Sequence, residues 1–204
     1  MDSVHGGWLL PLLSFTFVSS ITPGPNNLML ATSGARFGFR PSLPHLLGVP
    51  FGFAFLQALC AAGVGAFITA LPAAALGLKI AGTAYLVYLA FSLSRGGILP
   101  DADAPSASSP LSFWKSALFQ FANPKAWFMA VSASATLLPP FKSKPFAILA
   151  LCAVFCLMCL PCVAFWTAFG AMARRALASR PRLMRVLILA LTALTLYTAV
   201  AVWI

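Results

Sequence analysis

The sequence predicts an all-α, polytopic membrane protein with six transmembrane helices in two inverted three-helix repeats, the first helix of each repeat being broken. Composition is the first reason: 61% of the 204 residues are hydrophobic and 8% are charged, whereas a soluble domain carries about 25% charged residues. Apolar runs are the second, because several reach the roughly 20 residues that a helix needs to cross a bilayer. Third, prolines interrupt two of these runs at matching places.

The six predicted spans account for most of the chain and leave no room for a soluble domain. They lie at residues 8–33, 46–70, 78–93, 113–138, 146–172 and 186–204. A flexible Pro- and Ser-rich stretch, 94–112, follows the third span and divides the single domain 1–204 into repeat one, about 8–93, and repeat two, about 113–204. Because each repeat has an odd number of spans, the two insert in opposite directions.

The basic residues orient the chain. Of 13 Lys and Arg residues, nine fall in the loops after spans one, three and five, and three in the loops after spans two and four. Cytoplasmic loops collect Lys and Arg, so we expect both termini outside the cytoplasmic membrane. The net charge of +10 then reflects topology and contact with membrane lipids.

Several classes of protein are excluded or disfavoured. The composition excludes a soluble enzyme and a nucleic-acid-binding domain, and no nucleophile–base pair, carboxylate dyad or phosphate-binding loop appears. We therefore expect no enzymatic activity, no cofactor, no bound metal and no nucleic-acid partner. Residues 1–7 include Asp2 but no Lys or Arg, so we expect no cleaved signal peptide.

Two proline-containing segments predict a binding site within the membrane. Proline lacks an amide hydrogen and clashes with the preceding helical turn, so 22–27 (TPGPNN) and 120–125 (QFANPK) interrupt spans one and four. Irregular backbone survives at this depth only where it is buried in protein or lines a wet cavity. The residues predicted to bind substrate are Pro23, Gly24, Pro25, Asn26, Asn27, Asn123, Pro124 and Lys125.

The chain resembles the LysE/RhtB family of amino-acid exporters of bacterial inner membranes. The resemblance rests on the order and spacing of residues 22–26, 34–40, 48–52, 79–86 and 123–127, with Pro72, Trp166, Gly170 and the Arg-rich loop before the last span. One departure is Pro50, which adds a proline between the glycines of the second span. The resemblance implies secondary-active export of amino acids or close analogues, driven by the proton gradient.

An amino acid is a zwitterion, so its site must satisfy two opposite charges. Lys125 lies about twelve residues from either end of its span, and a cation at that depth is costly unless it has a function. We hypothesise that the substrate carboxylate meets Lys125 and the amides of a restarting half-helix. The ammonium would meet carbonyls released by the three prolines of the two breaks, with Asn26 and Asn123 as amide partners.

The distribution of acids favours a neutral substrate. The three Asp residues lie at the N-terminus or in 94–112, and none lies within a span. A dibasic amino acid would therefore lack a fixed anion for its second charge, which favours aliphatic or threonine- and homoserine-like substrates. Proton coupling would have to use His45, Lys125 or the substrate itself. Pairing with a second copy of the chain is left open.

The cysteines carry the alternative interpretations. Four of the five recur along one face of the fifth span: Cys152, Cys156, Cys159 and Cys162. They could serve a membrane thiol redox protein or bind a soft metal ion in a metal exporter. Ligands strung along a single helix make a poor tetrahedral site, so packing is the favoured role.

Overall fold

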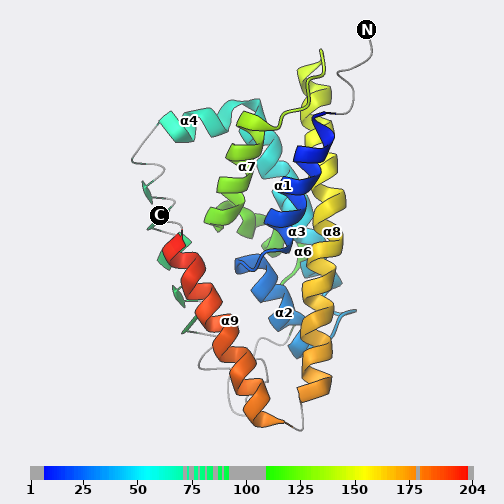
Figure 1. Cartoon of the computed structure of the whole chain (residues 1–204), viewed down its shortest axis with the longest axis vertical. Coiled ribbons are helices and arrows are strands. Elements are labelled where there is room, and N and C mark those ends of the chain that lie inside the picture. The colour runs from blue at the N-terminus through cyan, green and yellow to red at the C-terminus, as the bar shows by residue number, and fades with distance from the viewer. Residues whose placement is uncertain are drawn as a thin grey trace.

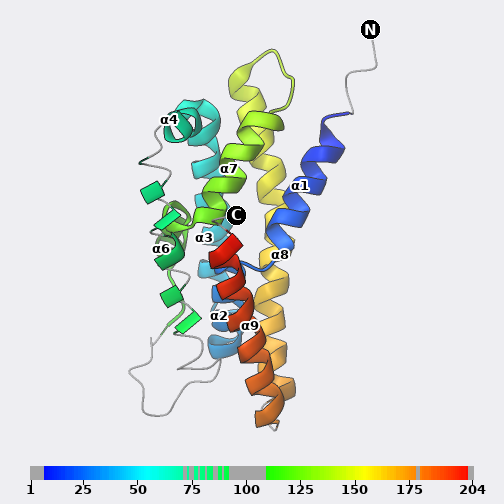
Figure 2. The same ribbon diagram turned by 60° about the vertical axis from the view of Figure 1, so that its left-hand side comes forward.

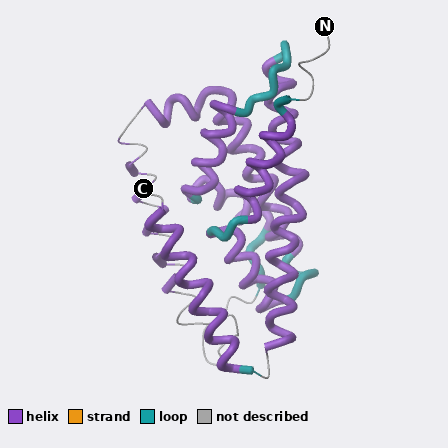
Figure 3. Tube along the Cα trace, in the orientation of Figure 1, coloured by secondary structure: helices purple, strands orange, loops and turns teal. Residues whose placement is uncertain are grey.

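The structure is a computed structural model, and its described part is helical without strands (Figure 3). It describes residues 7–70, 109–177 and 180–201, together with residues 73, 76, 77, 79, 80, 82–84, 87, 88, 90 and 91. Much of the predicted third span, 78–93, and most of the predicted flexible stretch, 94–112, lie outside the described residues.

The first span is broken as the sequence predicts. Helix α1, Leu9–Ile21, ends at Thr22, whose backbone is extended, and helix α2, Pro25–Phe37, begins three residues later. Pro25 occupies the first turn of α2, where the missing amide hydrogen costs nothing.

The fourth span is broken in the same way. Helix α6, Phe113–Phe119, tightens into a short 3₁₀ turn, η2, Gln120–Ala122, and helix α7, Pro124–Thr136, follows. Asn123 adopts an extended backbone between them and caps α7, since its side-chain oxygen accepts a hydrogen bond from the Lys125 amide at 3.1 Å.

The second span bends where the sequence predicts a continuous helix over 46–70. Helix α3, Leu43–Leu59, passes into a π-helical turn, η1, Cys60–Val64, and then into the short helix α4, Gly65–Ala70. Gly63 has a φ of 136°, a conformation that glycine adopts without the steric cost of a side chain. Consequently α4 turns aside from α3 instead of extending it (Figure 1).

The last two helices are regular. Helix α8, Lys144–Leu177, is longer at both ends than the predicted 146–172, and helix α9, Pro181–Ala201, begins five residues before the predicted 186–204. By length and apolar composition, two described helical segments can cross a bilayer, Leu43–Val64 and Lys144–Ala176. Shorter apolar helical segments lie at Leu9–Ile21 and Arg185–Tyr197.

The broken spans run in opposite directions and each packs on a helix of the other half. In Figures 1 and 2, α1 and α2 descend while α6 and α7 ascend, and α3 ascends while α8 descends.

The α2–α8 contact is very close, because a methyl group on Gly34 would collide with the Thr167 carbonyl and one on Gly170 with the Ala31 carbonyl. Helices α3 and α6 approach each other similarly.

That second close contact also depends on glycines. A methyl group on Gly48 would collide with the Phe113 carbonyl, and one on Gly52 with the Ala117 carbonyl. Small residues let helix backbones approach in this way in membrane proteins.

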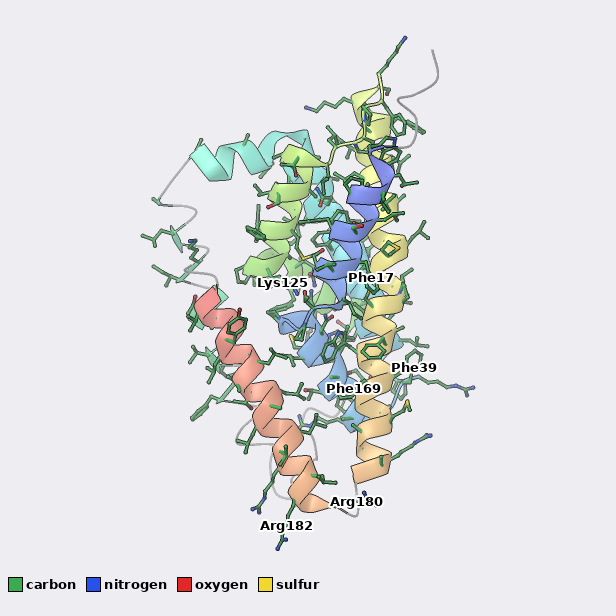
Figure 4. The ribbon with its side chains drawn as sticks, in the orientation of Figure 1. Phe17, Phe39, Lys125, Phe169, Arg180 and Arg182 are labelled. Atoms are coloured by element: carbon green, nitrogen blue, oxygen red, sulfur yellow. The ribbon has the colours of Figure 1, made fainter. Side chains whose placement is uncertain are left out.

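Two apolar clusters lie on either side of the breaks. The α2-side cluster joins α2, α3, α8 and α9, and its buried members include Leu30, Val49 and Val163. The α7-side cluster joins α1, α3, α7 and α8 and includes Phe53 and Phe155. The polar residues of the breaks lie between these clusters, at the level where Figure 4 places Lys125.

Candidate functional site

A cavity lies where the two breaks face each other. Its cavity volume is about 40 Å³, within about 430 Å³ of space between protein atoms that includes the opening to the outside. Polar residues come from both breaks, and apolar residues come from α3, α7 and α8. The lining residues are Ser19, Ser20, Gly24, Pro25, Asn26, Asn27, Val49, Phe53, Gln120, Asn123, Lys125, Ala126, Met129, Cys159 and Val163.

The first break leaves helix carbonyls without their usual partners, and protein side chains supply new ones. The side-chain amide nitrogen of Asn27 donates to the carbonyls of Ser20 and Thr22, both at 2.8 Å. The indole nitrogen of Trp166, on α8, donates to the Ile21 carbonyl at 3.0 Å. Buried backbone groups require such partners, so these side chains stabilise the broken conformation.

Lys125, which belongs to the second break, supplies a further hydrogen-bond donor to the carbonyls of the first break. Its ammonium Nζ donates to the carbonyl and to the hydroxyl of Thr22, both at 2.8 Å, and lies 3.4 Å from the Pro23 carbonyl. A methyl group on Gly24 would lie 2.9 Å from the Lys125 Cδ, so this glycine makes room for the lysine side chain. No Asp or Glu occurs in residues 7–100 or 104–204, and the positive charge is therefore held by neutral oxygens.

The two restarting helices differ at their N-termini. The first turn of α7 is capped by Asn123. The first turn of α2 has Gly24 at the capping position and receives no side-chain cap. Amides at a helix N-terminus attract negative charge. The first amides of α2 lie beside Lys125, so this corner of the cavity suits an anion.

Asn26 and Gln120 join the two breaks directly. The amide nitrogen of Asn26 donates to the Gln120 oxygen at 2.8 Å, and the amide nitrogen of Gln120 donates to the Asn26 oxygen at 3.0 Å. Gln120 is fully buried and also donates to the Ser116 carbonyl at 3.1 Å. The pair therefore bridges the two halves of the chain across the cavity.

Six of the eight predicted site residues line the cavity, and the other two do not. Pro23 and Pro124 are not lining residues; a methyl group on Gly82 would collide with the Pro124 ring. Carbonyls of the first break already accept hydrogen bonds from Asn27, Trp166 and Lys125. The hypothesis that such carbonyls also receive the substrate ammonium remains a prediction.

The predicted amide partners are occupied as well. Asn26 is hydrogen-bonded to Gln120, and the Asn123 side-chain oxygen accepts a hydrogen bond from the Lys125 amide.

The other nine lining residues were not predicted from the sequence. They are Ser19 and Ser20 at the end of α1, Gln120 on η2, and Val49, Phe53, Ala126, Met129, Cys159 and Val163.

His45 lies away from the cavity. It is buried on α3 with 2% of its surface exposed, and its carbonyl accepts a hydrogen bond from Ser116 Oγ at 2.8 Å. It is not among the lining residues, so a role in proton coupling remains a prediction.

The cysteines of α8 are divided between the cavity and a helix contact. Cys159 lines the cavity, while Cys152 and Cys156 donate weakly to the α3 carbonyls of Ala54 and Pro50, with sulfur–oxygen distances of 3.4 and 3.5 Å. All five cysteines are free thiols. Within the described residues, no three side chains of the His, Cys, Asp or Glu type come together as a metal site.

Comparison with known families identifies the family of this chain. The family model described as LysE type translocator matches residues 17–204. The chain belongs to the LysE family. LysE exporters are bacterial inner membrane proteins and transporters rather than enzymes.

Several curated relatives share one name. They include a cysteine/O-acetylserine efflux protein from Escherichia coli strain K12 and its counterparts from Escherichia coli O1:K1 and Shigella flexneri serotype 5b, each 35% identical over 128 residues. These alignments cover 62% of this LysE-family chain and 64% of each relative. The chain thus spans somewhat less than two thirds of their length. No solved structure matches.

Proposed function

We propose that this LysE-family protein is a secondary-active exporter of small neutral amino acids or their analogues, driven by the proton gradient across the cytoplasmic membrane. The observation that carries the proposal is the cavity between two broken helices, where Lys125 and the uncapped N-terminus of α2 adjoin apolar walls. The names of the relatives support amino-acid efflux in general.

The carboxylate of the substrate would bind between Lys125 and the first amides of α2. Two features of this corner support the assignment: Nζ of Lys125 carries the positive charge, and Gly24 leaves the helix end uncapped. A carboxylate there would share the lysine ammonium with the Thr22 carbonyl and hydroxyl. Charge-assisted hydrogen bonds of this kind are roughly twice as strong as neutral ones.

The substrate side chain would face the apolar walls. Val49, Phe53, Met129 and Val163 line that part of the cavity, and no carboxylate is present to receive a second cation. Uncharged side chains therefore fit, and dibasic amino acids do not. The relatives' names make L-cysteine and O-acetylserine the first substrates to test, beside threonine, homoserine and aliphatic amino acids.

Transport would alternate access between two inverted three-span repeats. The opposite directions of the broken spans support this arrangement, as does the reciprocal packing of the first span on α8 and the fourth on α3. Lys125 and Cys159 are the lining residues with ionisable side chains, and Lys125 is the stronger candidate for proton coupling. His45 is the weaker one because it lies outside the cavity.

Replacing Lys125 tests the proposal. Lys125→Gln keeps a hydrogen-bond donor for the Thr22 carbonyl but removes the charge, so we expect folding to persist and transport to fall about a hundredfold or more, as for loss of a charged partner. The measurement is uptake of labelled neutral amino acids into inside-out vesicles with an imposed proton gradient. Wild-type uptake should disappear when the gradient is collapsed.

The matched control is Lys142→Gln, which removes an equal charge from an exposed residue before α8. It should transport like the wild type. Unchanged transport by Lys125→Gln would remove Lys125 from the site. Failure of the wild-type protein to move any neutral amino acid would overturn the proposed function itself.

A further inference from the structure

The ammonium group of the proposed substrate needs oxygen acceptors, and the carbonyls of the first break are engaged by the protein. Among cavity-lining side chains in the described part of the chain, those of Ser20 and Asn27 offer further oxygen acceptors. Both are more than nine-tenths buried, with 7% and 4% of their surfaces exposed. They contact each other, because the Asn27 side chain donates to the Ser20 carbonyl at 2.8 Å.

The Ser20 hydroxyl is the first acceptor. Its Oγ is buried and makes no well-formed hydrogen bond among the described residues; the Cys159 thiol is its near neighbour. The neighbouring serine differs, since Ser19 Oγ donates to the Phe15 carbonyl at 2.6 Å. Cys159, another lining residue, offers only a weak sulfur partner. A buried hydroxyl left unpaired costs free energy, and a bound group that donates a hydrogen bond to its oxygen would lower that cost.

The side-chain oxygen of Asn27 is the second acceptor. Both partners of its amide group are carbonyl oxygens, those of Ser20 and Thr22, and carbonyls only accept hydrogen bonds. The nitrogen must therefore face them, which fixes the orientation of the amide. The Asn27 oxygen then faces away from these carbonyls.

Helix geometry favours a cation at this position. Ser20 belongs to the last turn of α1, and the C-terminal end of a helix carries partial negative charge. The proposed carboxylate position, at the start of α2, carries the opposite partial charge. The break in the first span thus offers partial negative charge to the ammonium group and partial positive charge to the carboxylate of a zwitterion.

We propose that Ser20 Oγ and the side-chain oxygen of Asn27 form the subsite that binds the α-ammonium group of the exported amino acid. This inference rests on the proposed function and assigns the acceptors of the ammonium group, whereas Lys125 is assigned to the carboxylate. It predicts that the protein discriminates an amino acid from the same molecule without its ammonium group.

The test compares L-cysteine with mercaptopropionate, which is cysteine with hydrogen in place of the ammonium. Inside-out vesicles containing the full-length protein take up labelled L-cysteine, and mercaptopropionate is added as a competitor. With wild-type protein we expect mercaptopropionate to compete poorly. Ser20→Ala should raise the KM for L-cysteine about tenfold, the loss of a hydrogen bond to a charged group, with little change in inhibition by mercaptopropionate. The discrimination ratio would therefore shrink about tenfold.

The control is Thr16→Val, one turn earlier on α1, which removes a buried hydroxyl already bonded to the Leu12 carbonyl at 2.6 Å and outside the cavity lining. It should leave the ratio unchanged. A general packing defect in Ser20→Ala would weaken both compounds alike, and that result would overturn the proposal, as would equal ratios in the Ser20→Ala and Thr16→Val variants. Uptake that requires Na⁺ at a constant proton gradient, and loses the Ser20 effect in its absence, would assign the oxygens to Na⁺ instead. Absence of wild-type amino-acid uptake would reject the proposed function, a separate outcome.

Discussion

At the scale of single residues, the site depends on which polar atoms the protein satisfies itself. Asn27, Trp166 and Lys125 take the carbonyls that the first break releases. Ser20 is left with a buried, unpaired hydroxyl. Most buried polar groups in proteins are hydrogen-bonded, so an exception inside a cavity indicates where a ligand would bind.

The amide pair between Asn26 and Gln120 gives a prediction at this scale. Asn26→Ala and Gln120→Ala should each lower the free energy of unfolding by about 1 to 2 kcal/mol, because each leaves a partner amide unpaired. The double variant should lose less than the sum of the two, by about 1 kcal/mol, because the residues interact directly. Equilibrium unfolding of the purified protein in mixed micelles measures all three. Strict additivity would mean that the two side chains do not interact.

At the scale of elements, glycines decide how closely helices approach. The contact between α2 and α8 uses Gly34 and Gly170, and that between α3 and α6 uses Gly48 and Gly52. In each case the atom a methyl group would meet first is a backbone carbonyl oxygen, which cannot rotate out of the way as a flexible side chain can.

A single methyl group should therefore separate α2 from α8. Gly170→Ala places its new carbon against the Ala31 carbonyl, and we expect it to destabilise the protein by about 2 to 3 kcal/mol. Gly77→Ala is the matched control, since nothing lies within 4 Å of the added carbon there. Thermal unfolding in detergent, followed by tryptophan fluorescence, should show a clear loss for the first variant only. Similar midpoints for both would contradict the close packing.

At the scale of the whole molecule, basic residues and helix direction define two ends. Helix α8 has 34 residues, a length of about 50 Å, which exceeds the thickness of about 30 Å of a hydrocarbon core. Arg180 and Arg182 lie at one end of the molecule (Figure 4), and Lys142 precedes the start of α8 at the opposite end.

The predicted orientation places Arg180 in the cytoplasm and Lys142 outside. In a protein whose five cysteines are replaced by serine, a membrane-impermeant thiol reagent should label Lys142→Cys in intact cells, and Arg180→Cys only in inside-out vesicles. The reverse pattern would invert the topology. The same cysteine-free protein should still transport, with a changed KM because Cys159 lines the cavity. A thiol redox protein or a soft-metal exporter would lose its activity.

The sequence by itself determined the helical membrane class, the places where two helices break, and the position of Lys125 beside the second break. Each follows from local chemistry: apolar runs fill a span, proline cannot donate to the preceding turn, and a cation at mid-span needs partners. The bend at Gly63 was not predicted from the sequence, because a lone glycine in an apolar run is equally compatible with a continuous helix.

Only the tertiary structure decided which atoms meet at the breaks. Asn26 and Gln120 are 94 positions apart, and Lys125 and Thr22 are 103 apart. Composition and periodicity describe neighbours along the chain, whereas partners for freed carbonyls come from whichever distant helix packs alongside. For the same reason Ser20, an ordinary serine near the end of a helix in the sequence, becomes a buried and unpaired acceptor beside the cavity once α1 has packed against the rest of the bundle.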